Sequence, residues 1–204
     1  MARNADASRA RIRAAAATEF AARGFAGAKV DRIALKARAN KALIYYHFKS
    51  KAGLYNAILH DTFAAMADAV RAVRESGGAP EAQLAAYVEA IAKVGAERPH
   101  FPAIWLREVA EGGRNVDVTV AGHFREVLTL LGHILEEGVT AGTMRPAHPF
   151  LVQMGVVGPL TLFMASKPLR ARFAHLPNGP DVSIEAVVRH VQTMVLGGVA
   201  RQVT

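Results

Sequence analysis

One stretch near the N-terminus is the clearest guide to the architecture: Asn40-Lys41-Ala42-Leu43-Ile44-Tyr45-Tyr46-His47-Phe48-Lys49-Ser50-Lys51. It places three lysines and several hydrogen-bonding aromatic side chains around a short apolar spine. Lysines neutralise phosphates, and aromatic and polar side chains reach sugars and base edges. The stretch is therefore typical of a helix that lies on DNA.

Positive charge is concentrated around this stretch. Residues 1–51 contain 12 Lys and Arg against 3 Asp and Glu, whereas the other 153 residues contain 13 against 14. The net charge of +8 for the whole chain therefore comes from its first quarter. A basic module on a near-neutral body indicates a polyanion binder, because a basic enzyme would spread its charge more evenly.

Composition excludes several other classes of protein. With 204 residues, of which 51% are hydrophobic, the chain is long enough to bury a core and is globular in type. Cysteine is absent, which excludes disulfide scaffolds, thiolate zinc sites and thiol redox sensing. The arginines and alanines at the N-terminus superficially suggest a signal peptide, but Glu19 and Arg23 interrupt that pattern. We therefore expect a cytoplasmic protein.

Residues 146–166 form the longest uncharged stretch that could be mistaken for a membrane span. Pro146, Pro149 and Pro159 fall inside it, together with polar side chains, so the apolar part is shorter than the ~20 residues that a spanning helix needs. We expect a helix buried in a core or a subunit interface, and no membrane partner.

Helical periodicity runs almost throughout and predicts an all-α protein. The expected helices cover residues 7–23, 29–37, 40–48, 51–75, 81–97, 99–110, 118–139, 150–165 and 183–199. Asp6 or Ser8 is expected to cap the first helix, and Gly24 to end it with Phe25 folded back on the apolar face. The proline-rich segment between residues 165 and 183 is expected to be a loop with about one helical turn.

The second and third of these helices form a helix-turn-helix. Arg38-Ala39 makes the turn, Asn40 caps the third helix, and Ile44 and Phe48 point inward.

From Arg11 to Leu59 the chain resembles the DNA-binding domain of TetR-type (TetR/AcrR) transcriptional regulators. The motif Leu43-Ile44-Tyr45-Tyr46-His47-Phe48 with Ser50-Lys51 carries the resemblance. It implies an N-terminal helix-turn-helix domain at 1–50 and a ligand-binding and dimerisation domain at 51–204, a helical bundle, with about nine helices in the chain. It further implies a repressor that a small molecule releases from a pseudo-palindromic double-stranded DNA operator.

The resemblance also assigns roles to residues of the N-terminal domain. Residues 41–43 match positions that approach base edges, residues 45–47 match positions that contact phosphates or bases, and Lys51 matches a lysine that binds phosphate. Ala28 stands where relatives often have a helix-capping Thr, so Lys29 is expected to take over that role. Arg38 replaces a usual turn glycine, which implies an adapted turn or a positive φ, and Leu43 replaces a frequent Thr. The expected DNA-binding residues are Lys29, Arg38, Asn40, Lys41, Ala42, Leu43, Tyr45, Tyr46, His47 and Lys51.

For the second domain the resemblance implies a homodimer formed by the eighth and ninth expected helices, and a ligand pocket. The expected interface residues are Phe150, Val152, Val156, Leu160, Phe163, Val187, Val191, Met194 and Val195. The candidate ligand-binding residues are Tyr87, Phe101, Trp105, Phe124, Met154 and Phe163, which favour a mostly hydrophobic small molecule. Apolar residues at helical spacing are equally consistent with plain core.

Three alternative interpretations stay open at this point. Tyr45 and Tyr46 are also consistent with core aromatics, and a DNA binder without an inducer, either nucleoid-associated or partner-recruiting, would use the same N-terminal domain. The pairs His123/Glu126 and His133/Glu136 have a spacing that can share a metal, although ten residues between them rotates one pair about 80° from the other. We expect surface pairs and no metal. Motifs of catalysis are absent from the sequence, so neither an enzyme nor a cofactor is expected.

Overall fold

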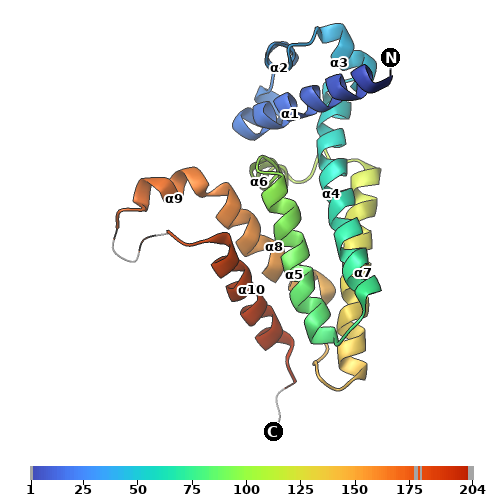
Figure 1. The fold of residues 1–204 in the computed structure, drawn as a ribbon, viewed down its shortest axis with the longest axis vertical. Coiled ribbons are helices and arrows are strands. Elements are labelled where there is room, and N and C mark those ends of the chain that lie inside the picture. Colours follow the sequence, from blue (N-terminus) through green and yellow to red (C-terminus); the bar gives the residue numbers. More distant parts are fainter. Residues whose placement is uncertain (1, 177–178, 180, 202–204) are drawn as a thin grey trace. The chain divides into compact units, whose positions relative to one another are not determined.

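The computed structural model describes residues 2–176, 179 and 181–201. Within these residues the chain forms ten α-helices, and its only extended pairing is an isolated bridge between Met144 and Ala200 (Figure 1). The helices are α1 (Ala2–Gly27), α2 (Val30–Ala37), α3 (Lys41–Phe48), α4 (Lys51–Ser76), α5 (Pro80–Glu97), α6 (Phe101–Ala110), α7 (Val118–Thr140), α8 (Pro149–Ala165), α9 (Lys167–Phe173) and α10 (Ile184–Val199). The all-α prediction is confirmed.

One helix lies where mainly loop was expected. Helix α9 forms two turns within residues 167–173, so the last expected helix becomes α10. Pro168 does not prevent α9 because it occupies the first helical turn, where the backbone N–H that proline lacks has no intrahelical partner.

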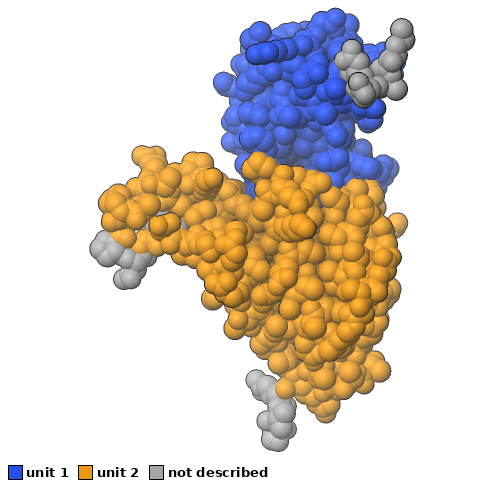
Figure 2. Space-filling model, in the orientation of Figure 1, with its two compact units in different colours: residues 1–63, 100–121 blue, residues 64–99, 122–204 orange. Residues whose placement is uncertain are grey.

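The chain divides into two compact units (Figure 2). Unit 1 contains residues 1–63 and 100–121, and unit 2 contains residues 64–99 and 122–204. The sequence predicted a functional division between residues 50 and 51, whereas the two compact units follow another boundary. Helix α6 and the first half of α4 belong with α1, because α1 packs on α6.

Helix α1 forms the centre of unit 1. Ile12, Ala16 and Phe20, spaced every four residues, are fully buried. Gly24 interrupts the helix with φ 66° and ψ 178°, which allows Phe25 to stack on Phe20 with ring centroids 6.2 Å apart. The start was predicted wrongly: α1 begins at Ala2, so neither of the expected capping residues, Asp6 and Ser8, lies at its N-terminus.

The turn between α2 and α3 follows a Schellman motif. Arg38 has φ 50° and ψ 46°, its N–H bonds to the Leu35 carbonyl, and the Ala39 N–H bonds to the Ala34 carbonyl. Of the two expected alternatives, an adapted turn or a positive φ, the structure has the positive φ. Asn40 caps α3 as predicted, because its Oδ1 accepts the Leu43 N–H at 2.7 Å.

Unit 2 is built on the contacts among α5, α8 and α10. These helices bury aliphatic and aromatic side chains against one another, with α7 adding further core residues; the fully buried examples are Leu84, Tyr87, Val88, Val156, Val191, Leu131 and Ile134. The C-terminal end of α10 is clamped to the turn after α7, since the N–H of Arg145 donates to the Val199 carbonyl at 2.8 Å.

Within the described residues, no helix taken alone has the length and apolar character needed to cross a membrane; α8 and α9 meet that test only as a pair bent by 63°.

Candidate nucleic-acid interface

Helix α3 has one buried face and one exposed face. Ile44 and Phe48 are buried, as predicted, whereas Tyr45 is 41% exposed and Tyr46 is 71% exposed. Exposed tyrosines beside an exposed Lys41 bring two kinds of DNA-contacting group to the surface. The alternative that the two tyrosines are core aromatics is therefore wrong.

Lys41 is paired across the turn with Asp31, with 2.9 Å between Nζ and Oδ1. The hydrogen bond that Lys41 donates to the Asp31 carboxylate raises the pKa of Lys41. Both groups are at least half exposed, and exposed ion pairs contribute little to stability. The ammonium can therefore leave Asp31 for a phosphate or a base edge at small cost.

Two expected DNA-binding residues flank the turn. Arg38 is exposed and has no carboxylate partner among the described residues. Lys29 sits at the N-cap of α2 without a side-chain capping bond, because an ammonium only donates hydrogen bonds. The expectation that Lys29 caps α2 in place of a threonine is therefore wrong. The charged side chain of Lys29 is nevertheless exposed.

Two other expected contacts are already engaged within unit 1. The Nζ of Lys51 donates to the carbonyls of Ala28 at 3.0 Å and Ala26 at 3.4 Å, which leaves one of its three protons for a phosphate. His47 Nε2 lies 3.1 Å from the hydroxyl of Ser8. Leu43 is half-buried and Ala42 is exposed.

A buried carboxylate holds α2 against α1. Glu19 is 1% exposed and accepts from Arg32 Nε at 2.6 Å, while Lys36 and Arg23 lie within 3.7 Å. Burial by itself would raise the pKa of Glu19, but the hydrogen bonds from Arg32 and from the Lys29 backbone N–H, with the nearby cations, lower it overall. The sequence analysis did not identify this cluster. Its only signal in the sequence was a single acidic residue beside the apolar stripe of α1.

A second buried carboxylate joins α4, α6 and the segment after α6. Glu108 is 1% exposed, and its oxygens accept from the Tyr55 hydroxyl at 2.7 Å and from the Asn115 backbone N–H at 2.8 Å. Burial and the hydrogen bond to Glu108 both raise the pKa of Tyr55. The ring of Tyr55 also meets Phe20 edge to face at 4.9 Å, so the network reaches α1. No sequence spacing signals it, because its members lie about 50 residues apart.

Comparison with known proteins agrees with this geometry. Residues 12–58 match the family described as bacterial regulatory proteins, tetR family. The HTH-type transcriptional repressor SCO4008 of Streptomyces coelicolor is 52% identical over 58 residues, which is 28% of this chain and 30% of that protein. The HTH-type transcriptional repressor NicS of Pseudomonas putida is 29% identical over 146 residues, 71% of this chain and 69% of that protein.

The whole fold also has a solved counterpart. A crystal structure of a tetR-family regulatory protein from Rhodococcus RHA1 superposes with a TM-score of 0.77 over 96% of this chain and 98% of that chain, at 20% identity. Residues 12–58 therefore match the DNA-binding domain of the TetR family, and the likeness of the whole chain to the solved structure is one of fold. Helices α2 and α3 lie within the matched residues and are arranged as a helix-turn-helix.

The six candidate ligand-binding residues are divided between the two units. Phe101 and Trp105 belong to unit 1, where both meet Phe63, with ring centroids 5.6 Å and 4.9 Å away. The other four belong to unit 2. Tyr87 is fully buried there, and its hydroxyl donates to Gln153. Burial raises the pKa of Tyr87, so the phenol stays neutral.

The other three candidates in unit 2 differ in exposure. Met154 is 40% exposed, Phe124 is half-buried, and Phe163 lies 3.6 Å below the guanidinium of Arg170. The sequence could not separate these environments, because all six residues occupy apolar positions of helices.

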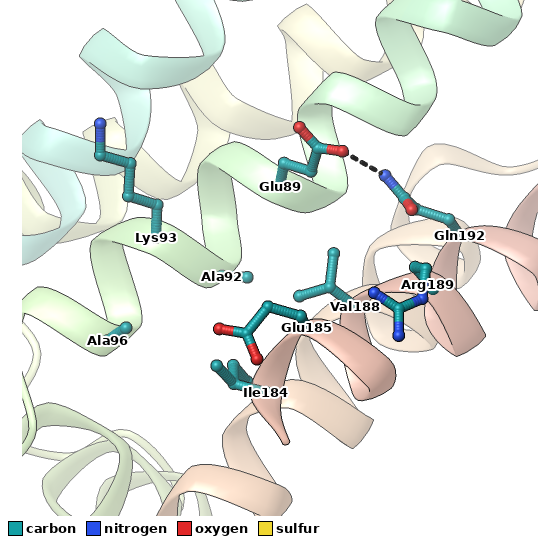
Figure 3. A pocket seen from close by; sticks show the side chains of 9 residues that line it. All are labelled: Glu89, Ala92, Lys93, Ala96, Ile184, Glu185, Val188, Arg189 and Gln192. Atoms are coloured by element: carbon teal, nitrogen blue, oxygen red, sulfur yellow. Dashed lines mark hydrogen bonds between the residues drawn. The ribbon is translucent and has the colours of Figure 1, made fainter. Parts of the chain in front are cut away.

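A groove of about 480 Å³ lies between α5 and α10 of unit 2 (Figure 3). Ala92, Ala96, Ile184 and Val188 form its apolar part, and at one end the Gln192 amide bridges to Glu89 at 2.8 Å. None of the six candidate ligand-binding residues lines this groove.

The two His-Glu pairs on α7 behave as surface groups. His123 Nδ1 lies 3.8 Å from Glu126, whose carboxylate also accepts from Arg71. His133 and Glu136 are both exposed. Within the described part of the chain, no group of three or more His, Cys, Asp and Glu side chains could hold a metal ion.

Proposed function

We propose that this TetR-family regulator is a homodimeric repressor that binds a pseudo-palindromic operator and leaves it when a small molecule binds. The exposed face of α3 carries the proposal. It presents Tyr45, Tyr46 and Lys41 on a helix whose other face is buried, in the part of the sequence that holds the excess positive charge. Two relatives are named repressors, and the DNA partner implies a cytoplasmic location.

The dimer part of the proposal rests on the two faces of α8 and α10. Five of the nine residues expected at the interface are buried inside the chain and cannot reach a second copy: Val152, Val156, Leu160, Val191 and Val195. This corrects the interface expected from the sequence.

The opposite faces of these helices expose a separate apolar set, which includes Leu151 at 68%, Leu162 at 61%, Met154 and Met194. Residues 151, 154, 158 and 162 follow helical spacing, so on α8 they form one stripe. We therefore propose that this outer face, and not the inner one, meets the second copy. Two-fold symmetry would then present two recognition helices to successive major grooves about 34 Å apart, or a multiple of that distance.

The proposed inducer is a mostly apolar small molecule. Aromatic side chains are available for it in both units, but no described contact identifies its site. Such a ligand releases DNA only to the extent that it binds the non-DNA-binding conformation more tightly than the binding one.

The first test is fluorescence anisotropy with the duplex that flanks this protein's own gene, against a scrambled duplex, at moderate salt. We expect at least about a hundredfold preference for the native duplex, within the range of specific protein–DNA recognition. Equal binding to both duplexes would favour a distant operator or the nucleoid-associated alternative. Absence of binding to either would refute DNA binding by α3.

The dimer is tested separately by sedimentation equilibrium. We expect Leu151→Glu to shift the protein towards monomer, because it places a charge in the middle of the outer stripe, whereas Leu176→Glu, on an exposed leucine outside α8 and α10, should leave the dimer intact. If neither variant dissociates the dimer, the second copy binds to a different surface.

A further inference from the structure

The first turns of α1 are tied to the end of the recognition helix. Ser8 is 6% exposed, and its hydroxyl donates to the Ala5 carbonyl at 2.8 Å. The same oxygen lies 3.1 Å from His47 Nε2. A serine hydroxyl has one proton, and that proton goes to Ala5, so His47 Nε2 must be the donor in the second bond. The imidazole thus links α3 to a segment 39 residues earlier in the chain.

Arg9 follows Ser8 at the same end of α3. Its guanidinium carbon lies 5.8 Å from the centre of the Phe48 ring, the last residue of α3. Arg9 is exposed and has no ion pair among the described residues. Arg13, one turn later on the same helix, is neutralised by Asp61 at 2.9 Å. Arg9 can therefore bind an outside partner without giving up an ion pair, whereas Arg13 would first have to leave Asp61.

The position of Arg9 selects phosphate as that partner. An α-helix with its side chains is about 10–12 Å across and nearly fills a major groove about 12 Å wide. Groups that flank the end of a recognition helix therefore meet the sugar–phosphate strand at the groove edge. An aromatic ring beside the guanidinium limits its rotation and leaves the N–H groups at its rim free for phosphate oxygens.

We propose that the first turns of α1 are part of the DNA interface, with Arg9 binding a backbone phosphate and the Ser8–His47 hydrogen bond holding Arg9 in register with α3. This inference rests on the proposed DNA binding by α3. It assigns to His47 a positioning role through Nε2, in place of a direct phosphate contact from that nitrogen. Ser8 likewise acts as a positioning residue and does not touch DNA.

The test compares full-length wild-type protein with Arg9→Ala, Arg9→Lys and Arg13→Ala. Affinity is measured by anisotropy over a series of KCl concentrations, on both the native upstream duplex and the scrambled duplex. For Arg9→Ala we expect the slope of log K against log salt to become shallower by about 0.9 for each helix-turn-helix domain bound, on both duplexes. Arg9→Lys should keep most of the wild-type slope, and Arg13→Ala should leave it unchanged.

A double-mutant cycle tests the positioning role. Ser8→Ala removes the acceptor of His47 and favours the helix, so α1 should remain folded. If Ser8 acts through Arg9, Ser8→Ala should make the slope shallower in the wild-type background and have no further effect when Arg9 is already alanine. Independent, additive losses would refute the positioning role.

The inference and the proposed function fail in different ways. If wild-type protein binds DNA and Arg9→Ala keeps the wild-type slope, the α1 contact is overturned while binding by α3 stands. If wild-type protein binds neither duplex, both are overturned.

Discussion

Arg38 permits a sharp separation of backbone strain from charge. It ends α2 in the left-handed region, with φ 50° and ψ 46°, and its side chain is exposed without an acidic partner among the described residues. A residue with a Cβ in this region costs roughly 1–2 kcal/mol relative to right-handed backbone. Glycine avoids that cost but loses roughly 0.5–1 kcal/mol more conformational entropy on folding.

The two replacements Arg38→Gly and Arg38→Ala therefore differ in a defined way. Subtracting the midpoint of the entropy cost from the midpoint of the relieved strain, we expect Arg38→Gly to stabilise the protein by about 0.75 kcal/mol. Arg38→Ala keeps the Cβ and should leave stability unchanged within about 0.5 kcal/mol. Both variants remove the same charge, so both should make the slope of log K against log salt for DNA binding shallower by about 0.9 for each helix-turn-helix domain bound.

Urea unfolding measures the first difference. Trp105 is the only tryptophan in the chain and belongs to unit 1, so its fluorescence reports on the unit that contains the turn. All proteins must be compared at one concentration, because the stability of a dimer depends on it. Equal stability of the Gly and Ala variants would refute the strain argument. If both variants keep the wild-type slope of log K against log salt, Arg38 does not contact DNA.

Three further predictions concern buried groups. Glu19→Gln should destabilise the protein by about 1.5–3 kcal/mol at neutral pH, because it removes a charge-assisted acceptor. Folding lowers the pKa of Glu19, so the carboxylate should contribute its full stability above the ordinary glutamate pKa and lose it as the pH falls below that value. The urea midpoints of wild type and variant should therefore converge in acid. Tyr55→Phe should cost about 1.5–3 kcal/mol by removing the donor to buried Glu108, and a loss no larger than that of an exposed Tyr46→Phe control would contradict the network. Gly138→Ala should cost about 1–3 kcal/mol, measured by thermal unfolding, because the added Cβ would lie 2.6 Å from Met144 Cγ; an unchanged melting temperature would show that Met144 moves aside freely.

The sequence alone determined nine of the ten described helices, including the helix-turn-helix near the N-terminus. Their signals are local: apolar residues recur with the helical period, Asn40 has the side chain that an N-cap needs, and the charge surplus sits in the first 51 residues. At Arg38 the departure from a turn glycine left two alternatives, an adapted turn or a positive φ, and the structure shows the positive φ. Such features depend on neighbours within a few residues and survive in any fold that keeps the helices.

Only the tertiary structure decided which face each helix buries and which charges remain available. Helix α8 is apolar all round, so periodicity could not tell buried Val156 from exposed Leu151. The engagement of His47 by Ser8 depends on packing between segments 39 residues apart, and that of Tyr55 by Glu108 on segments 53 residues apart. A side chain's partner in such cases is set by where the backbone brings distant residues together, and one-dimensional spacing does not contain that information.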